Sequence, residues 1–105
     1  MQAIAKGEYE EAERQIETLL AEKPKSAVAL NLRAALRTRQ GKFKEAEEAL
    51  DEAIASNPRN YFAYYNMAKL LLQMRPEDPS VAKRYYETGR AVGGPADAAL
   101  EAVFR

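Results

Sequence analysis

The side chains in this chain that could do chemistry are carboxylates and serines, because its 105 residues include no cysteine and no histidine. This removes the commonest general base, the commonest zinc ligand and any thiolate nucleophile. Neighbouring acids recur along the chain, but lysines or arginines lie close to them, which is typical of solvated helix faces. The acidic pairs are Glu10-Glu11, Glu47-Glu48 and Asp51-Glu52.

The remaining polar motifs are better explained by turns and helix ends than by a reaction. Ser26, Ser56 and Ser80 lie at expected helix ends, where a hydroxyl caps free N–H groups. Glu77-Asp78 is far short of the ligand spacing of a calcium loop, and no phosphate-binding lysine follows Gly93-Gly94. We therefore predict no catalytic residue, no metal site and no cofactor, and we do not expect an enzyme.

The composition excludes two other classes of protein. Sixteen basic and sixteen acidic residues give a formal net charge of zero, whereas general binders of nucleic acid or of anionic membranes need an excess of Lys and Arg. No apolar run approaches the roughly 20 residues of a membrane span. We expect a soluble protein that binds neither nucleic acid nor membrane, and the sequence leaves open whether it is cytoplasmic or periplasmic.

The elements that position these side chains follow from an internal repeat. Residues 41–58 nearly repeat residues 7–24 at a constant offset of 34. A period of about 34 residues is the mark of a helix–turn–helix array, so we predict an all-α fold. The matching pairs are Gly7 and Gly41, Tyr9 and Phe43, Ala12 and Ala46, Ile16 and Leu50, Leu20 and Ile54, and Pro24 and Pro58.

Glycine, proline and capping residues set the expected helix limits. Residues 1–6 look like the end of a helix, Gly7 a turn, and Gly93-Gly94 a C-terminal stop. Asp78 and Pro79 should start one helix, with Val81 among its inward residues, and Pro95 should open a last helix with Val103 on its apolar side. The predicted helices are 8–22, 27–40, 42–56, 61–74, 79–91 and 95–104.

Two groups of residues carry a family resemblance. The stretch Gly41-x-Phe43-x-x-Ala46 is one, and Tyr64-x-x-Met67-Ala68 is the other. The chain resembles the tetratricopeptide repeat family in both. The resemblance implies a right-handed stack of antiparallel helix pairs within one domain, 1–105. Its parts would be a partial first repeat 1–26, a second repeat 27–60, a third repeat 61–94 with a two-residue insertion, and a capping helix 95–105.

Two arginines depart from the family pattern, because Arg33 and Arg37 stand where apolar residues are usual. Their stems could lie over the core with the charged ends in water. Alternatively, they could pair with glutamates of the preceding helix, such as Glu13 and Glu17. A one-residue shift of the helix would break the period and would turn inward Leu32 and Leu36.

The resemblance also implies where a partner would bind, since the first helix of each pair lines a concave groove in this family. We expect the groove to bind a peptide or a helix of another protein. Phe62 and Tyr65 would be its exposed aromatic residues, unless they pack under neighbouring structure. The predicted groove residues are Asn31, Ala35, Thr38, Arg39, Phe62, Tyr65, Asn66, Lys69 and Gln73.

Two further expectations concern the partner. Some members of this family hold a peptide carboxylate in a clamp of lysine, asparagine and arginine. Here the positions of its last lysine and arginine correspond to Phe62 and Asn66, and the asparagine position of the preceding repeat corresponds to Leu32. We therefore do not expect recognition of an acidic C-terminal tail. The alternative function is structural: the open edge formed by the helix at 8–22 could support self-association or packing within a longer protein, because an uncovered apolar stripe is an association site.

Overall fold

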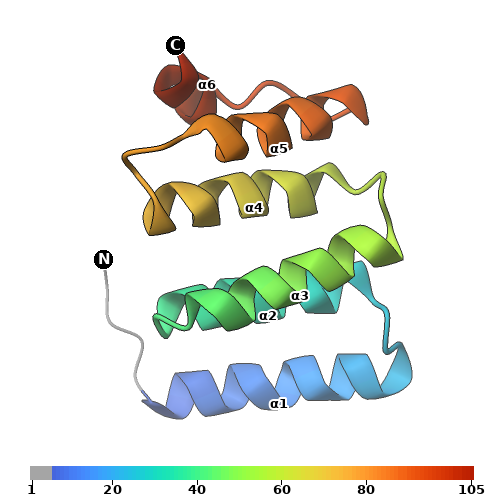
Figure 1. Ribbon diagram of the computed structural model, residues 1–105. Coiled ribbons are helices and arrows are strands. Elements are labelled where there is room, and N and C mark those ends of the chain that lie inside the picture. The colour runs from blue at the N-terminus through green and yellow to red at the C-terminus, as the bar shows by residue number, and fades with distance from the viewer. Residues whose placement is uncertain (1–5) are drawn as a thin grey trace.

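The computed structural model describes residues 6–105, which form six α-helices and, over that range, no strand. The helices α1 to α5 run antiparallel in turn, with α1 at one end of the stack, α2 and α3 together at the next level, then α4 and α5, and the short α6 at the other end (Figure 1). The all-α stack of helical hairpins predicted from the period is thus confirmed. The helices are α1 (Lys6–Glu22), α2 (Ala27–Arg39), α3 (Phe43–Ser56), α4 (Tyr61–Met74), α5 (Ser80–Ala91) and α6 (Ala98–Phe104).

The first predicted turn is wrong, because Gly7 lies inside α1. Its φ is not positive, and a Cβ added there would meet no atom within 4 Å. Nothing around Gly7 therefore requires a turn, and a helix tolerates an exposed glycine at a cost of about 1 kcal/mol. The expected helix end at residues 1–6 falls almost wholly outside the described residues.

Two other glycines do end helices as predicted. Gly41 and Gly93 have φ values of 76° and 107°, a region that L side chains rarely adopt. After Gly41, the N–H of Lys42 donates to the carbonyl oxygen of Arg37 at 2.8 Å. After Gly93, the N–H of Gly94 donates to the carbonyl oxygen of Gly89 at 2.9 Å. These bonds satisfy carbonyls that the helix leaves free and fix the angle at which the next segment leaves.

The last helix begins later than predicted, at Ala98 instead of Pro95. Asp97 is the reason: its side chain accepts a hydrogen bond from the N–H of Leu100 at 3.0 Å and so caps the helix. α5 likewise begins at Ser80, with Pro79 as its N-cap residue, while Asp78 Oδ1 accepts the N–H of Ser80 at 3.2 Å.

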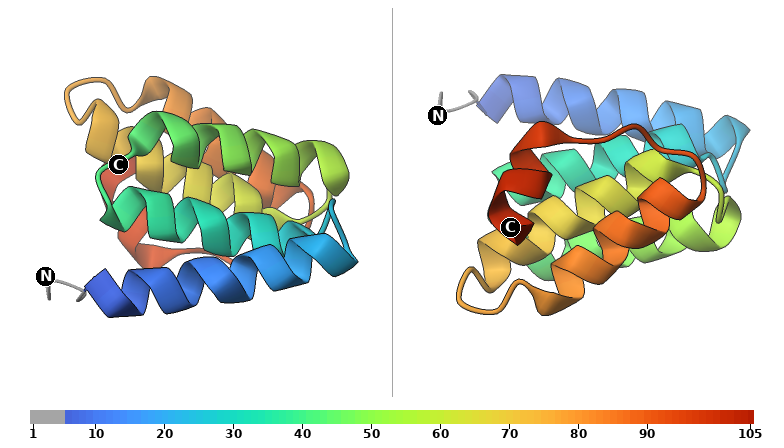
Figure 2. Two further views of the ribbon diagram at one scale, coloured as in Figure 1. Left: turned by 90° about the horizontal axis from the view of Figure 1, so that it is seen from below. Right: turned by 90° about the horizontal axis from the view of Figure 1, so that it is seen from above.

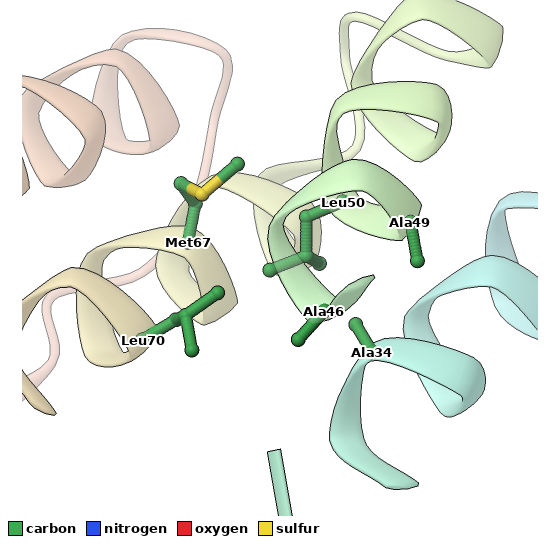
Figure 3. Close-up of a cluster of buried hydrophobic side chains, with 6 residues drawn as sticks. All are labelled: Ala34, Ala46, Ala49, Leu50, Met67 and Leu70. Atoms are coloured by element: carbon green, nitrogen blue, oxygen red, sulfur yellow. The ribbon is translucent and has the colours of Figure 1, made fainter. Parts of the chain in front are cut away.

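Small residues let three helices approach closely at the centre of the molecule. Ala34 of α2 shares one hydrophobic cluster with Ala46, Ala49 and Leu50 of α3 and with residues of α4 (Figure 3). Ala46 is 0 % exposed. Interiors are close-packed, so an alanine at such a crossing cannot be enlarged without moving a helix. The α4 members of the cluster are Met67 and Leu70.

Two residues predicted to face inward are exposed. Val81 on α5 is 42 % exposed because the buried stripe follows Ala82, Tyr86 and Gly89, and a residue next to Ala82 is turned by about 100° around the helix. Val103 on α6 is 50 % exposed, whereas Leu100 is buried against the tyrosines of α4 and α5. α6 thus covers the end of the stack with one buried leucine.

The register of α2 follows the 34-residue period. Ala34 is buried and Leu32 is 48 % exposed, so the one-residue shift is wrong. The predicted pairing is confirmed for Arg37, whose guanidinium donates to both carboxylate oxygens of Glu13 at 2.7 Å and lies 3.1 Å from Glu45. Arg33 differs, because its buried Nε has no hydrogen-bond partner. Arg37 therefore joins α1, α2 and α3 by charge.

Candidate functional site

A pocket of about 480 Å³ lies between α2 and α4. We call it the α2–α4 groove. Its floor is mostly apolar and includes Phe43, Leu50 and Leu70. Six of the nine residues predicted from the resemblance line it, three from each helix: Ala35, Thr38 and Arg39, and Asn66, Lys69 and Gln73.

Local sequence explains why these side chains share one face. On α4, Asn66, Lys69 and Gln73 are three and four residues apart, which places them in a row along the helix. Asn31 lies beside the row: its Oδ1 accepts a hydrogen bond from Asn66 Nδ2 at 3.4 Å. This amide pair joins α2 to α4 at one end of the groove.

Phe62 lies on the same face of α4, four residues before Asn66, but does not line the pocket. Its ring is 59 % exposed and stacks on Tyr61 with centroids 4.4 Å apart. The prediction that Phe62 is exposed is therefore confirmed. Aromatic residues, Phe among them, are enriched in protein–protein interfaces relative to the rest of the surface.

The prediction that Tyr65 is exposed is wrong. Tyr65 is only 6 % exposed, and its hydroxyl donates to the carbonyl of Pro95 at 2.5 Å. A Cβ added to Gly89 would lie 2.5 Å from the Tyr65 ring, so α5 approaches this ring where only glycine fits. Burial raises the pKa of the Tyr65 hydroxyl. The glycines at 89 and 94 were the sequence signal for this close approach.

The charge of the α2–α4 groove is positive. Arg39 and Lys69 are its charged lining residues, and no carboxylate lines it. Lys69 Nζ lies 3.8 Å from Asp97 Oδ2, but the lysine side chain is still 55 % exposed. The groove can therefore attract an acidic group, and it offers side-chain amides for hydrogen bonds.

Within residues 6–105, no group of three or more acidic residues is placed to hold a metal ion. None of the six helices described is long and apolar enough to cross a membrane.

Comparison with known proteins identifies the family. The model of the tetratricopeptide repeat matches residues 2–61 and again 34–78. The chain belongs to the tetratricopeptide repeat family. Neither the curated proteins nor the solved structures that were searched gave a match. Tetratricopeptide repeats generally mediate protein–protein interaction or scaffolding, and they are typically non-catalytic.

A second pocket of this tetratricopeptide repeat chain, about 490 Å³ in volume, lies between α1 and α2. We call it the α1–α2 groove. Leu19 of α1 and Leu32 of α2 line it and are 40 % and 48 % exposed. The sequence predicted that the helix at 8–22 forms an open edge. It did not predict that Leu32 belongs to this edge, because only the arrangement of α1 and α2 brings Leu32 into one pocket with Leu19. The other lining residues are Glu8, Tyr9, Ala12, Gln15, Ile16, Ala35, Leu36 and Arg39.

Proposed function

We propose that this chain is a protein-interaction module that binds a peptide or a helix of a partner protein in the α2–α4 groove. The observation that carries the proposal is the convergence of six exposed or half-buried residues of α2 and α4 on one pocket with an apolar floor. The general role of tetratricopeptide repeats in protein–protein interaction also supports the proposal.

The groove's chemistry suggests what the partner carries. Arg39 and Lys69 favour an acidic side chain at the rim, since no lining carboxylate competes for it. Phe43, a half-buried residue of the floor, favours an apolar side chain there. Phe62, one turn beyond Asn66, offers a further apolar contact. We therefore expect a segment that alternates apolar and acidic residues.

We also propose the division of the chain into repeats. Residues 27–60 contain the α2–α3 pair and residues 61–94 the α4–α5 pair, with α1 in a partial repeat at 1–26 and α6 in a cap at 95–105. The constant offset of 34 residues between α2 and α4 supports these limits.

Selection from a library of displayed random peptides would test the binding site. Peptides selected on the wild-type chain would be titrated by fluorescence anisotropy against two variants that each remove a positive charge without adding a negative one. Lys69→Gln changes this groove alone, whereas Arg39→Gln changes a residue that lines both grooves. Arg84→Gln is the matched control, because Arg84 is exposed on α5 and lines neither groove.

We expect the selected peptides to be enriched in Asp and Glu, and each groove variant to weaken binding by about fivefold to tenfold, which corresponds to about 1 kcal/mol or slightly more. Phe62→Ala should weaken binding by a similar factor. Peptides that bind all groove variants as tightly as wild type, or that lose affinity for Arg84→Gln instead, would refute the proposal.

A second candidate function is assembly through the edge at α1, and the exposure of Leu19 and Leu32 favours it. Apolar surface left open in a repeat array is an association site. Sedimentation of the wild-type chain over a range of concentrations tests whether the edge joins two copies, because a concentration-dependent shift lost in Leu19→Glu would show it.

A further inference from the structure

The α1–α2 groove has a counterpart one repeat later, and there a helix occupies it. Adding 34 to Ala12, Ile16 and Leu36, which line the groove, gives Ala46, Leu50 and Leu70. All three counterparts belong to the cluster that Ala34 of α2 completes. The α1–α2 groove is thus the repeat-equivalent of the surface on α3 and α4 that α2 covers.

The exposed fractions of its side chains show that the α1–α2 groove is uncovered within residues 6–105. Ala46 is 0 % exposed under α2, whereas Ala12 is half-buried. Ala53 is 0 % exposed, whereas its counterpart Leu19 is 40 % exposed. An apolar surface with the shape of a helix-binding site is therefore open in the described part of the chain.

An acidic residue also recurs at the same repeat position on the two surfaces. On the covered surface, Arg37 Nε of α2 lies 3.1 Å from Glu45 Oε2 of α3. The counterpart of Glu45 on α1 is Glu11, whose side chain is 54 % exposed and pairs with Arg14 on its own helix. A helix lying in the α1–α2 groove as α2 lies on α3 would bring a basic residue to Glu11.

We propose that the α1–α2 groove binds an amphipathic α-helix of a partner protein that carries a leucine, an alanine four residues later and an arginine or lysine three residues after that. This is the pattern of Leu30, Ala34 and Arg37 on α2. The inference rests on the edge at α1 being an association surface. Ala35 and Arg39 line both grooves, whereas Leu19 lines only this one and Lys69 lines only the α2–α4 groove.

Two elements of a second copy, α2 and α6, fit the groove poorly. The matching face of its α2 is already buried on its own α3. Its α6 has seven residues, fewer than the stretch of α1 from Glu8 to Leu19 that lines the groove. A separate helix of about α2's length matches the surface better.

A peptide with the sequence of residues 27–40 is a suitable probe. In the peptide, a hydrocarbon staple in place of Val28 and Leu32, which lie one turn apart and are 66 % and 48 % exposed on α2, keeps it helical and lies opposite Leu30 and Ala34. The labelled peptide is titrated with the full chain and followed by fluorescence anisotropy. We expect saturable binding, weakened at least about tenfold by Ala34→Leu in the peptide, because a larger side chain does not fit against Ala12.

Variants of the chain then locate the binding site. Leu19→Glu and Leu32→Glu should each weaken binding at least about tenfold, since both side chains are exposed and line the groove. Val81→Glu, a matched exposed apolar residue on α5, should leave it unchanged. Lys69→Gln should also leave it unchanged, which separates this site from the α2–α4 groove. Circular dichroism melts confirm that each variant is folded.

Three results would overturn the proposal. One is the absence of saturable binding of the stapled peptide. Another is binding that Leu19→Glu and Leu32→Glu leave intact. The third is a wild-type dimer that Leu19→Glu dissociates, because a second copy would then be the occupant. If Lys69→Gln weakens binding of the peptides selected on the wild type, and the stapled peptide does not bind, this inference is refuted while the proposed function stands.

Discussion

Two surfaces of the molecule are equivalent by repeat but differ in whether a helix covers them. One lies on α3 and α4 beneath α2, and the other is the α1–α2 groove one repeat earlier. The first is a closed interface in which Ala46 and Ala53 are fully buried. The second has Ala12 half-buried and Leu19 exposed at the same repeat positions. In Figure 1, α2 and α3 lie between α1 and α4, whereas α1 lies at one end of the stack.

This difference shows that a repeat position fixes which side chain can pack, while the neighbouring helix decides what that side chain contributes to stability. In a linear array the free energy of unfolding is a sum of repeat and interface terms. Ile16 and Leu50 are both almost fully buried, at 3 % and 1 % exposed. Among residues 6–105, Leu50 belongs to a cluster to which three helices contribute, and Ile16 does not.

Truncating these two residues should give the largest effects and would sharpen the comparison. Large-to-small changes in a core cost about 2–5 kcal/mol. We expect Leu50→Ala near the upper end of that range, because three surrounding helices cannot collapse into the cavity, and Ile16→Ala near the lower end. Urea unfolding followed by circular dichroism measures both. A cost for Ile16→Ala equal to that of Leu50→Ala would break the comparison.

Enlarging the two matched alanines should give the next largest difference. Ala46→Leu should lower the free energy of unfolding by about 1–3 kcal/mol, because a fully buried site beneath α2 must be overpacked. Ala12→Leu should change it by less than about 0.5 kcal/mol, since the side chain can extend into the α1–α2 groove. Equal destabilisation of both variants would show that the α1–α2 groove is already filled.

The charge link between α1 and α2 gives a pH-dependent prediction. Hydrogen bonds from Arg37 hold the pKa of Glu13 below its ordinary value of 4.5. A carboxyl whose pKa is lower in the folded state stabilises the fold above its unfolded pKa, and this stability is lost as the pH falls through the folded value. Glu13→Gln should therefore cost about 1–2 kcal/mol at pH 7.

The cost of Glu13→Gln should shrink as the pH falls below 4.5 and vanish once the wild-type carboxyl is protonated. Urea unfolding of wild type and variant between pH 7 and pH 3 measures this. Glu10→Gln, an exposed residue on the same helix, is the control and should stay within about 0.5 kcal/mol at every pH. A cost that does not depend on pH would refute the ion-pair explanation.

The smallest effect is expected on the open surface itself. Leu19→Gln and Leu32→Gln should each change the free energy of unfolding by less than about 0.5 kcal/mol, because both leucines are already about half exposed. Thermal melts of the two variants check this. A loss above about 2 kcal/mol for either variant would mean that the leucine is buried in solution.

Much of the fold could be predicted because glycines, prolines and caps mark helix ends locally. α4 begins and ends at the predicted residues, 61 and 74, where Asn60 caps its start. Gly7 was mispredicted because a glycine ends a helix only where its surroundings need a positive φ, and only Gly41 of the two matched glycines has one. The helix α6 begins after the predicted Pro95 because the side chain of Asp97 caps it.

The candidate site could be predicted in part for the same reason. The row on α4 follows from helical spacing alone, so Asn66, Lys69 and Gln73 lie together as expected. The prediction for Tyr65 was wrong because the segment that covers this residue contains Pro95, which lies thirty residues later in the chain. Burial by a distant segment has no local signal other than the glycines that allow the close approach.

The most direct test of the account is an NMR titration of the ¹⁵N-labelled chain with a peptide selected on the wild type. We predict that the largest amide shifts fall on the groove residues of α2 and α4, led by Thr38, Asn66 and Gln73, with small shifts on the outer faces of α3 and α5. Shifts concentrated on α3 and α5, with the α2–α4 groove unchanged, would contradict the central claim that this groove is the binding surface.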